Sequence, residues 1–460
     1  MIRNPLCAPA AIGLAGLFAL SHSPLAAAGY AIAEQSLSGL GYGFAGAAAI
    51  AEDNSTIWHN PAGLTYLGDT PQFTGGVHLI LPEATFKNTG TLSAVPVSAT
   101  EVQFVPTQGA NDTSDTGAIV PNLFYSHPVS EDLVLGFALN VPFGLATEYE
   151  EDWVGRYVAV ESDLRTVNLN PTAAYRINEQ WSIGFGANVV LSEAVLSNAV
   201  DFGLIGLAQI PSSALGATAA DIVANRGGTK YDGFLHLEGD GVGYGFNFGV
   251  LWEPRTGTRL GLHYRSQVEL ELEGDADFTV GLLEPYLGGA FPDQGGTVDL
   301  TLPSTVSLSV AHEVNAALTL LADLTWTDWS VFDELAIVFE TGSPPTRPIP
   351  ENWGDTLRYS VGARYVVNEH FALRAGLVYD EAAVPGPEYV SPRIPDAERT
   401  WLALGGQWQV GNGWAVDVAF AHVFVADSKT NNSSHTAGNI LIGENEASVS
   451  ILSVGTNYRF

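Results

Sequence analysis

The sequence predicts an all-β protein: a transmembrane antiparallel β-barrel of about 14 strands, with an N-terminal hatch (plug) inside the lumen. Runs of about ten residues alternate between apolar residues and small or polar ones, as in strands with lipid on one side and a lumen on the other. Short connections between these runs alternate with long ones. Glycine is abundant (50 of 460 residues), charged residues are only 15%, and no run of about 18 apolar residues that could form a spanning helix follows the first 28 residues.

The first 28 residues have the features of a secretory signal peptide. Arg3 supplies the charged start, residues 10–20 form the apolar core, and Ala26-Ala27-Ala28 offers a small-residue cleavage site. The single cysteine, Cys7, lies in this leader. The mature chain is therefore expected to contain no disulfide and no cysteine-based metal site.

Residues 29–67 are predicted to form the hatch. This stretch is rich in Gly and Ala, contains no Lys or Arg, and ends in Asn60-Pro61-Ala62. Small residues suit a segment that must fit a crowded lumen. Its Gly41–Gly46 stretch matches GxGxxG, but no strand precedes it in a βαβ unit and no ribose-binding acid follows. A flexible linker is the alternative, although such linkers are poor in aromatic residues such as Trp58.

Residues 68–460 are predicted to form the barrel wall. The last run shows the alternation, with Leu452, Val454 and Tyr458 on one face and Ser453, Gly455 and Asn457 on the other. The predicted strands start near residues 72, 119, 132, 164, 180, 242, 258, 298, 317, 355, 370, 399, 413 and 447. The long connections run roughly over 86–118, 142–163, 193–241, 274–297, 329–354, 381–398 and 426–446.

Composition excludes several classes of function. A net charge of −32 with only three lysines excludes a nucleic-acid binder. The acidic loops could bind divalent cations or suit a saline medium, and the sequence does not choose. No GxSxG, HExxH or Walker motif is present, so neither an enzyme, a cofactor nor a metal is expected. A nonspecific porin and, less favoured, an outer-membrane lipase are the alternatives to a selective channel.

Several segments resemble the long-chain fatty acid outer-membrane transporter family (FadL type), which includes relatives that take up aromatic hydrocarbons. The resemblance covers essentially the whole mature chain and rests on SGLGYGFAGAAAIAEDNSTIWHNPAGL (38–64), FGLATEYEEDW (143–153), NLNPTAAYRINEQWSIGFG (168–186), LHYRSQVELELEG (262–274), LPSTVSLSVAHEV (302–314), LTWTDWSVFDEL (324–335) and VPGPEYVSPRIPDAERTWLALG (384–405). It implies a monomeric barrel in the Gram-negative outer membrane, in contact with lipid and lipopolysaccharide. It further implies energy-independent uptake of hydrophobic small molecules, and assembly machinery that reads the terminal Phe460.

Two binding sites follow from this resemblance. A capture groove is expected between the outer loops 193–241 and 274–297, because apolar residues in loops that face water indicate a docking surface. Its residues would be Phe202, Leu204, Leu207, Phe278, Leu282, Leu283, Tyr286 and Phe291. The alternative is that the two loops pack on each other and cap the barrel. The inner pocket is expected at Gly29, Tyr30, Ile32, Val189, Leu191, Leu196, Asn198 and Arg347.

The inner pocket departs from the pattern of fatty-acid transporters. Those proteins place a basic residue near the position of Asn198, and Arg347 lies near a second basic position of the family through a loose alignment. A buried carboxylate needs a charged or multiply hydrogen-bonding partner. The sequence therefore favours neutral hydrocarbons over fatty acids without excluding either.

A sideways exit is predicted at the third strand, through Gly136, Asn140, Pro142 and Gly144. Proline has no N–H for the ladder and is avoided in central strands, and glycine permits a bulge. Such a defect would expose unpaired backbone groups to lipid unless the hatch covers them. The alternative is that Pro142 merely starts the outer loop.

Overall fold

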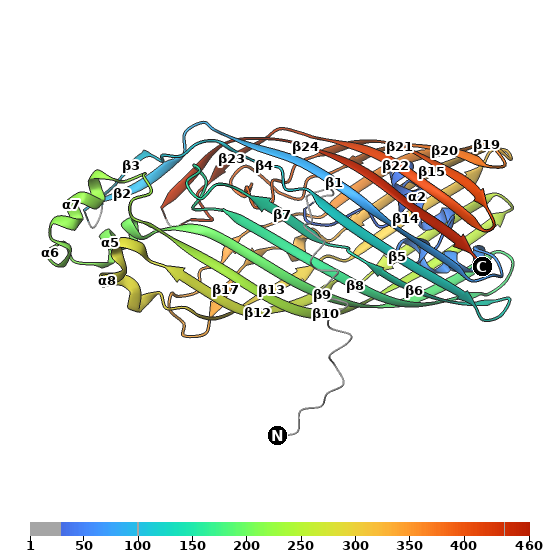
Figure 1. Ribbon diagram of the computed structural model, residues 1–460, viewed down its shortest axis with the longest axis horizontal. Helices are drawn as coiled ribbons and strands as arrows, with labels where there is room; N and C mark the ends of the chain where they lie inside the picture. Colours follow the sequence, from blue (N-terminus) through green and yellow to red (C-terminus); the bar gives the residue numbers. More distant parts are fainter. Residues whose placement is uncertain (1–28, 99–100, 437) are drawn as a thin grey trace, which may run out of the picture.

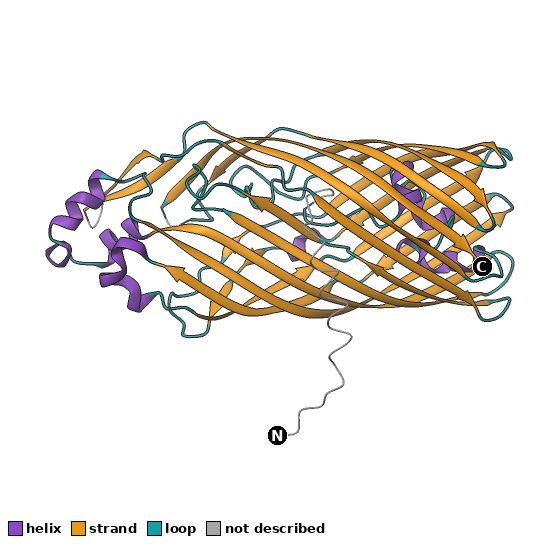
Figure 2. Cartoon of the chain, viewed as in Figure 1, coloured by secondary structure: helices purple, strands orange, loops and turns teal. Residues whose placement is uncertain are grey.

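A computed structural model describes residues 29–98, 101–436 and 438–460; the predicted signal peptide lies outside these ranges. The chain forms one elongated barrel whose strands are tilted to its long axis (Figures 1 and 2). Most of the short helices lie either inside the barrel, near the end where strand turns are short, or outside it at the opposite end, and one short turn lies near the middle. Among the described residues no helix is long and apolar enough to span a membrane.

The barrel closes because β1 pairs with β24 along its whole length, from Gln72↔Arg459 to Asn88↔Gly443. Six of the wall strands are each made of two collinear pieces. The wall consists of β1 (Gln72–Asn88), β4 and β5 (Asp112–Ser114, Ala118–Pro128), β6 and β7 (Leu133–Asn140, Gly144–Glu148), β8 (Glu161–Arg176), β9 (Trp181–Asp201), β10 (Asp232–Arg255), β11 and β12 (Thr258–Arg265, Val268–Thr279), β14 and β13 (Thr305–Glu313, Gln294–Leu302), β15 and β17 (Leu318–Thr327, Ile337–Phe339), β19 (Thr356–Asn368), β20 (Phe371–Asp380), β21 (Arg399–Gly411), β22 and β23 (Trp414–Val425, Ser428–Asn432) and β24 (Asn439–Arg459). These are fourteen strands, which confirms the predicted barrel.

The remaining elements lie in the outer connections. They are the hairpin β2 and β3 (Leu92–Ser98, Glu101–Pro106), the helices α5 (Phe202–Gln209), α6 (Ser212–Leu215), α7 (Ala217–Ala224) and α8 (Glu284–Leu287), the 3-10 turns η2, η3 and η4 (Gly281–Leu283, Gly288–Ala290, Trp329–Val331), and the small pair β16 and β18 (Glu334–Leu335, Ile349–Pro350).

The predicted outer loop 193–241 is too long, because β9 continues to Asp201 and β10 begins at Asp232. These outer ends pair with each other from Asp201↔Asp232 inward. Beyond the membrane the outward face no longer needs apolar residues, and Glu193 faces Asp240 across the two strands. The alternation that marks the strands therefore fades before the strands end.

The outward face carries the apolar side chains. Tyr244, the most exposed of them at 73%, lies with Phe246 and Phe248 on one strand. Aromatic pairs gather at the short-turn end of the barrel, where Trp181 and Trp252 stack at 5.3 Å and Trp414 lies 4.4 Å from Tyr458. Such pairs suit a membrane interface.

The segment 29–67 lies inside the ring of strands and is almost wholly buried. It contains α2 (Leu37–Gly41), α3 (Ala47–Ile50), α4 (Thr56–His59) and η1 (Pro61–Tyr66). Asn60 precedes η1 as its N-cap: its Oδ1 accepts from Ala62 N at 3.1 Å while Nδ2 donates to Val250 O of the wall at 3.0 Å. Pro61 at the first position needs no N–H partner. The Asn-Pro-Ala ending thus both starts a turn and fixes it to β10.

Glycines on the inward face of the wall let this segment dock. A Cβ at Gly261 would overlap the Ala48 carbonyl, and one at Gly376 would overlap the Tyr42 carbonyl. Five wall glycines face backbone atoms of this segment, namely Gly184, Gly261, Gly362, Gly376 and Gly405, and four others face its side chains, namely Gly76, Gly136, Gly249 and Gly455. The inward glycines therefore serve close backbone approach rather than an open lumen.

A buried ionic network also joins the segment to the wall. Glu52 Oε1 accepts from Arg364 Nε at 2.7 Å and from Arg374 Nη2 at 2.8 Å. Arg374 Nη1 donates in turn to Asp417 Oδ1 at 2.5 Å, and Asn457 Nδ2 donates to Asp417 Oδ2 at 2.7 Å. Glu52 thus bridges β19 and β20 from inside the barrel, and Asp417 of β22 extends the network from Arg374 to β24.

Candidate functional site

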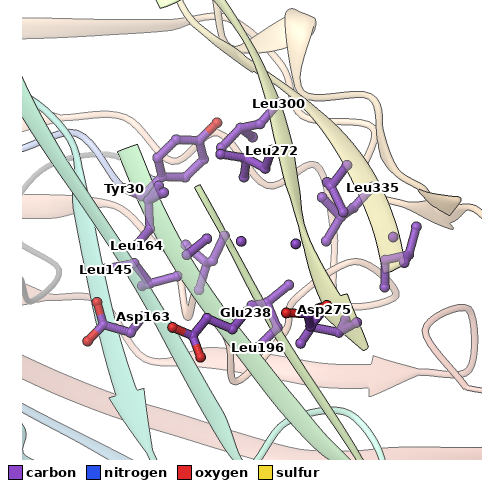
Figure 3. A pocket seen from close by; sticks show the side chains of 18 of the residues that line it. Tyr30, Leu145, Asp163, Leu164, Leu196, Glu238, Leu272, Asp275, Leu300 and Leu335 are labelled. Carbon is purple, nitrogen blue, oxygen red and sulfur yellow. The ribbon is translucent and has the colours of Figure 1, made fainter. Parts of the chain in front are cut away.

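An apolar pocket of about 790 Å³ of empty space lies inside the outer half of the barrel. We call it the apolar pocket; its lining comes from β7–β10, β12, β13, β17 and the connections around them. Leucine side chains converge on it while three carboxylates lie at its rim (Figure 3). It is lined by Tyr30, Leu145, Asp163, Leu164, Ala194, Leu196, Leu237, Glu238, Gly239, Leu272, Gly274, Asp275, Gly296, Val298, Leu300, Phe332, Leu335, Ile337 and Ile394. No Lys or Arg belongs to this lining.

The space exists because a row of small residues crosses the wall. Ala194 pairs with Gly239, Gly239 with Gly274, and Gly274 with Gly296, on neighbouring strands. Cross-strand partners share one face of a sheet. Four adjacent strands, β9, β10, β12 and β13, therefore carry almost no side chain along this row. The leucines on either side of the row enclose the space.

Tyr30 closes the apolar pocket on its inner side. Its ring is 2% exposed and lies 4.9 Å from Trp329, 5.5 Å from Phe332 and 6.0 Å from both Trp353 and Phe143. Such tilted and edge-on aromatic pairs each add roughly 0.5–1.5 kcal/mol beyond the buried area. The start of the inner segment is therefore held by packing rather than by ions.

The structure places the predicted pocket residues in different parts of the barrel. Tyr30 and Leu196 line the apolar pocket, and Gly29 lies beside Trp329 and Trp353 with its N–H donated to Asp396 Oδ1 at 3.1 Å. Ile32 is buried but lines a different, polar cavity.

Val189 and Leu191 lie on the outward face of β9, since their partners Tyr244 and Val242 are exposed to the membrane side. The inward residue between them, Val190, packs in the pocket's apolar cluster. A one-residue register shift exchanges the two faces of a strand. The sequence pattern identified the right strand and the wrong face.

The two predicted polar positions lie outside the apolar pocket. Arg347 is exposed on an outer loop, where Nη2 donates to Thr436 O at 3.0 Å. Asn198 Oδ1 accepts from Arg393 Nη2 at 3.1 Å.

Arg393 was not predicted. Burial lowers its pKa to about 10, and burial raises the pKa of the nearby Glu351 carboxyl to about 8. Its neighbour Ile394 lines the pocket, and both residues belong to the stretch 384–405 that carries the family resemblance, which was the available signal.

The predicted capture residues are packed against one another. Phe202, Leu283 and Phe291 are buried in one cluster, with Leu207 and Phe278 against it. Phe202 and Phe278 lie 5.0 and 5.6 Å from the ring of Phe291. Leu282 and Tyr286 remain exposed, and Leu204 is half-buried. Helices α5 and α8 lie side by side at this end (Figure 1). In this conformation the two loops cap the barrel, as the alternative interpretation expected.

The third wall strand is broken where a sideways exit was predicted. β6 ends at Asn140 and β7 begins at Gly144. β6 pairs with β5 only from Leu123↔Leu139 to Pro128↔Val134. β7 pairs with β8 but not with β5. Residues 118–122 of β5 therefore face no ladder partner on this side; we call this gap the wall break.

The start of the inner segment occupies the inner side of the wall break. Ile32 N donates to Pro142 O and Gly144 N donates to Tyr30 O, both at 2.9 Å, around an isolated bridge between Ala31 and Phe143. Asn140 Nδ2 donates to Gln35 Oε1 at 2.6 Å. Gly136 lies on β6, four residues before Asn140, and faces Ile57 and Leu64. Of the four predicted exit residues, three contact or pair with residues 30–35 and Gly136 faces a deeper part of the same segment.

A lipid-facing barrel that encloses an apolar pocket and a packed inner segment is the architecture of an outer-membrane channel for apolar solutes. The chain belongs to the outer membrane protein transport protein family (OMPP1/FadL/TodX), whose model matches residues 18–460. This membership confirms the predicted family, outer-membrane location and non-enzymatic transport function.

Individual relatives support the same placement. The chain is 30% identical to the long-chain fatty acid transport protein of Escherichia coli K12, covering 97% of this chain and 98% of the relative. It is 31% identical to outer membrane protein P1 of Haemophilus influenzae, over 86% of each chain. In fold it is similar to a Pseudomonas aeruginosa FadL homologue (TM-score 0.81, 22% identity, 94% and 100% coverage). It is also similar to the toluene transporter TodX of P. putida (TM-score 0.63, 20% identity, 88% and 94% coverage).

Proposed function

We propose that this channel takes up neutral hydrocarbons, with the apolar pocket as the inner binding site. The observation that carries the proposal is the pocket lining: it is leucine-rich, holds no cation, and has three carboxylates at its rim. Transferring an alkyl chain from water into such a lining gains about 0.8 kcal/mol per CH₂. Asp163 is paired with Arg165 at 2.6 Å, so Glu238 and Asp275 are the rim carboxylates that would disfavour an approaching fatty-acid carboxylate, whereas a neutral chain is unaffected.

The inner segment 29–67 would act as the hatch. Residues 36–67 are fixed by the Glu52 network, by Asn60 and by close glycine contacts, whereas residues 30–32 are held by aromatic packing and by the wall break. Withdrawal of residues 30–32 alone would open the floor of the apolar pocket and uncover the wall break. The solute would then leave sideways into the bilayer.

Capture at the outer end would begin at the exposed residues Leu282 and Tyr286, and separation of the two loops would complete a groove with Phe202 and Phe291. The single chain forms a closed barrel, in keeping with a monomer. The outward apolar belt would contact lipid and lipopolysaccharide. Phe460, exposed at the end of the closing strand, would be read by the assembly machinery.

A pocket-filling variant tests the binding site. Gly296 has no backbone atom near enough to oppose a side chain, so Gly296→Phe should place a ring in the pocket. Gly406 lies on the outward face of β21 with similarly loose contacts, so Gly406→Phe is the matched control. We expect Gly296→Phe to reduce cellular uptake of labelled hexadecane and toluene at least tenfold and Gly406→Phe to leave it unchanged. Equal uptake by both variants would contradict the proposed pocket.

A disulfide lock tests the exit. Ala31 and Phe143 are opposite each other as a non-hydrogen-bonded pair, for which Cα atoms lie about 4.5 Å apart, within disulfide range. The sequence has one cysteine, Cys7, in the leader. The disulfide in oxidised Ala31→Cys/Phe143→Cys should stop uptake, and its reduction should restore uptake. Each single cysteine variant serves as the control, because it shows the effect of losing the native side chain alone. Undiminished uptake by the fully oxidised protein would exclude this exit.

A further inference from the structure

A second cavity, of about 830 Å³ of empty space, lies between the inner segment and strands β11, β14, β15 and β19. We call it the polar cavity. Ala31, Ile32, Pro142 and Phe143 belong to its lining, so it adjoins the wall break, whereas Tyr30 lines the apolar pocket. The start of the inner segment therefore separates the two spaces.

The charged groups of the polar cavity balance one another. Its lining contains two guanidiniums, Arg265 and Arg358, and two carboxylates, Asp323 and Asp380. Asp380 is the partner of Arg358 in the β19–β20 ladder, and Asp323 accepts from the hydroxyl groups of two neighbours. An ion of either sign would meet groups of its own sign in this space, and a buried charge is unfavourable without a dedicated partner. The polar cavity therefore suits an uncharged solute.

Two buried side chains on β11 have hydrogen-bonding capacity to spare. His263 is 4% exposed, and its Nε2 has no hydrogen-bond partner among the described residues. Arg265 follows two residues later and so lies on the same face of the strand. Its Nη1 donates to Asn188 Oδ1 at 3.0 Å and its Nη2 donates to Trp58 O at 2.7 Å, which uses two of its five N–H groups. Leaving a buried polar atom without a partner is unfavourable.

Aromatic rings supply the rest of the contact surface. Trp58, His59, Phe143 and Trp329 belong to the lining of the polar cavity. The guanidinium carbon of Arg265 lies 3.2 Å from the centre of the Trp58 ring, which fixes the plane of the fork. Flat apolar faces of this kind pack well against another aromatic ring.

We propose that the polar cavity binds an uncharged hydroxylated aromatic compound, a phenol or a naphthol. Its hydroxyl group would accept from an N–H of Arg265 and donate to Nε2 of His263, while its ring would pack among Trp58, Phe143 and Trp329. A hydroxyl is both donor and acceptor, and a hydrocarbon of the same shape can serve neither group. The inference rests on the proposed function, because the solute would enter by the same withdrawal of residues 30–32. It adds a hydroxylated class to the neutral substrates.

The test compares 2-naphthol with 2-methylnaphthalene, which carries a methyl group in place of the hydroxyl. Radiolabelled ligands are dialysed to equilibrium against the purified protein in lipid nanodiscs, with protein-free nanodiscs as the blank. His263→Phe keeps a ring of similar size and removes both nitrogens. We expect it to lower the affinity for 2-naphthol about tenfold and to change the affinity for 2-methylnaphthalene less than twofold. His263→Gln keeps an acceptor and should stay within threefold of the wild type for both ligands.

Three further variants separate this site from other effects. His263→Leu repeats the loss of the nitrogens with a smaller side chain, in case the phenylalanine variant does not fold. His422→Phe changes a histidine on the outward face of β22, where Phe420 and Phe424 are exposed, and should leave both affinities unchanged. Gly296→Phe fills the apolar pocket and should weaken 2-methylnaphthalene, while the effect of His263→Phe on 2-naphthol should persist in the double variant.

Equal 2-naphthol affinity in the wild type and in folded His263→Phe or His263→Leu would overturn the inference. A parallel loss of both ligands would overturn it too, because His263 would then only support the inner segment. Tighter wild-type binding of the carboxylate analogue 2-naphthoate than of 2-naphthol would show an anion site instead. Binding of 2-methylnaphthalene that is insensitive to Gly296→Phe, together with 2-naphthol binding that depends on His263, would contradict the proposed apolar pocket and support the polar cavity.

Discussion

Removal of the Glu52 carboxylate should release the proposed hatch, residues 29–67, from the wall. Glu52→Ala leaves Arg364 without its partner and Arg374 with Asp417 alone. Breaking a buried ion pair costs about 3–5 kcal/mol. The lower end applies here, because the Glu52 side chain keeps 11% exposure and Arg374 retains one carboxylate. A loss of about 3 kcal/mol raises the population of the undocked hatch roughly a hundredfold.

Single-channel recording in planar bilayers measures this population directly, because an undocked hatch leaves an ion path through the lumen. We expect Glu52→Ala to raise the frequency or duration of open events by about that factor. Glu446→Ala is the control, since it removes only the exposed pair with Lys87, and such pairs contribute little. The variant Glu52→Ala/Arg364→Met also removes the orphaned cation and should recover part of the loss. A folded Glu52→Ala barrel with wild-type conductance would refute the assignment of this network as the hatch anchor.

Three other perturbations probe the hatch and the outer loops. Burial raises the pKa of the Glu34 carboxyl to about 7; docking should therefore be strongest below pH 4.5 and weaken as pH rises to about 7. Open events should follow that pH dependence in the wild type and lose it in Glu34→Gln. Gly376→Val should expel the hatch by overlap with its backbone and raise conductance, whereas the outward Gly406→Val should not. Replacing Leu282 and Tyr286 together by Ser should lower the capture rate of hexadecane several-fold without changing conductance, measured as the initial rate at low concentration.

The barrel could be predicted from the sequence because lipid imposes a simple rule on each strand. Residues such as Leu452 and Val454 must face the membrane, and their neighbours must not, so the period of two is visible without knowledge of any partner. This alternation is imposed only on the part of each strand that lies in the membrane. Glu193 and Asp240 face each other on strands that continue into water, and no alternation marks them, so these strand ends were predicted as loops.

The inner site could be predicted only in part, because its space arises between strands. Gly239, Gly274 and Gly296 create the apolar pocket through their register, and register is not written in any one segment. Val189 and Leu191 were predicted to line the pocket, whereas the inward residue is Val190. This error has the same origin, because a one-residue uncertainty in register exchanges the two faces of a strand. Arg393 reaches Asn198 across 195 positions of sequence, a contact that depends on the closed barrel.

In the proposed mechanism the segment from Tyr30 to Ile32 would couple binding to release, because one short piece of chain contributes to two closures. Tyr30 contributes its ring to the floor of the apolar pocket, and Tyr30 O and Ile32 N complete the backbone bonding of the wall break. A solute that displaces the ring must therefore also disturb the two hydrogen bonds that cover Pro142 and Gly144. A ligand shifts such an equilibrium only by its differential affinity for the two states. An apolar solute would provide that difference, because it would fill the space left by the ring, whereas ions and water would not. If the proposed exit is correct, the arrangement that opens the wall for a hydrocarbon would keep it closed to solutes that the pocket cannot hold.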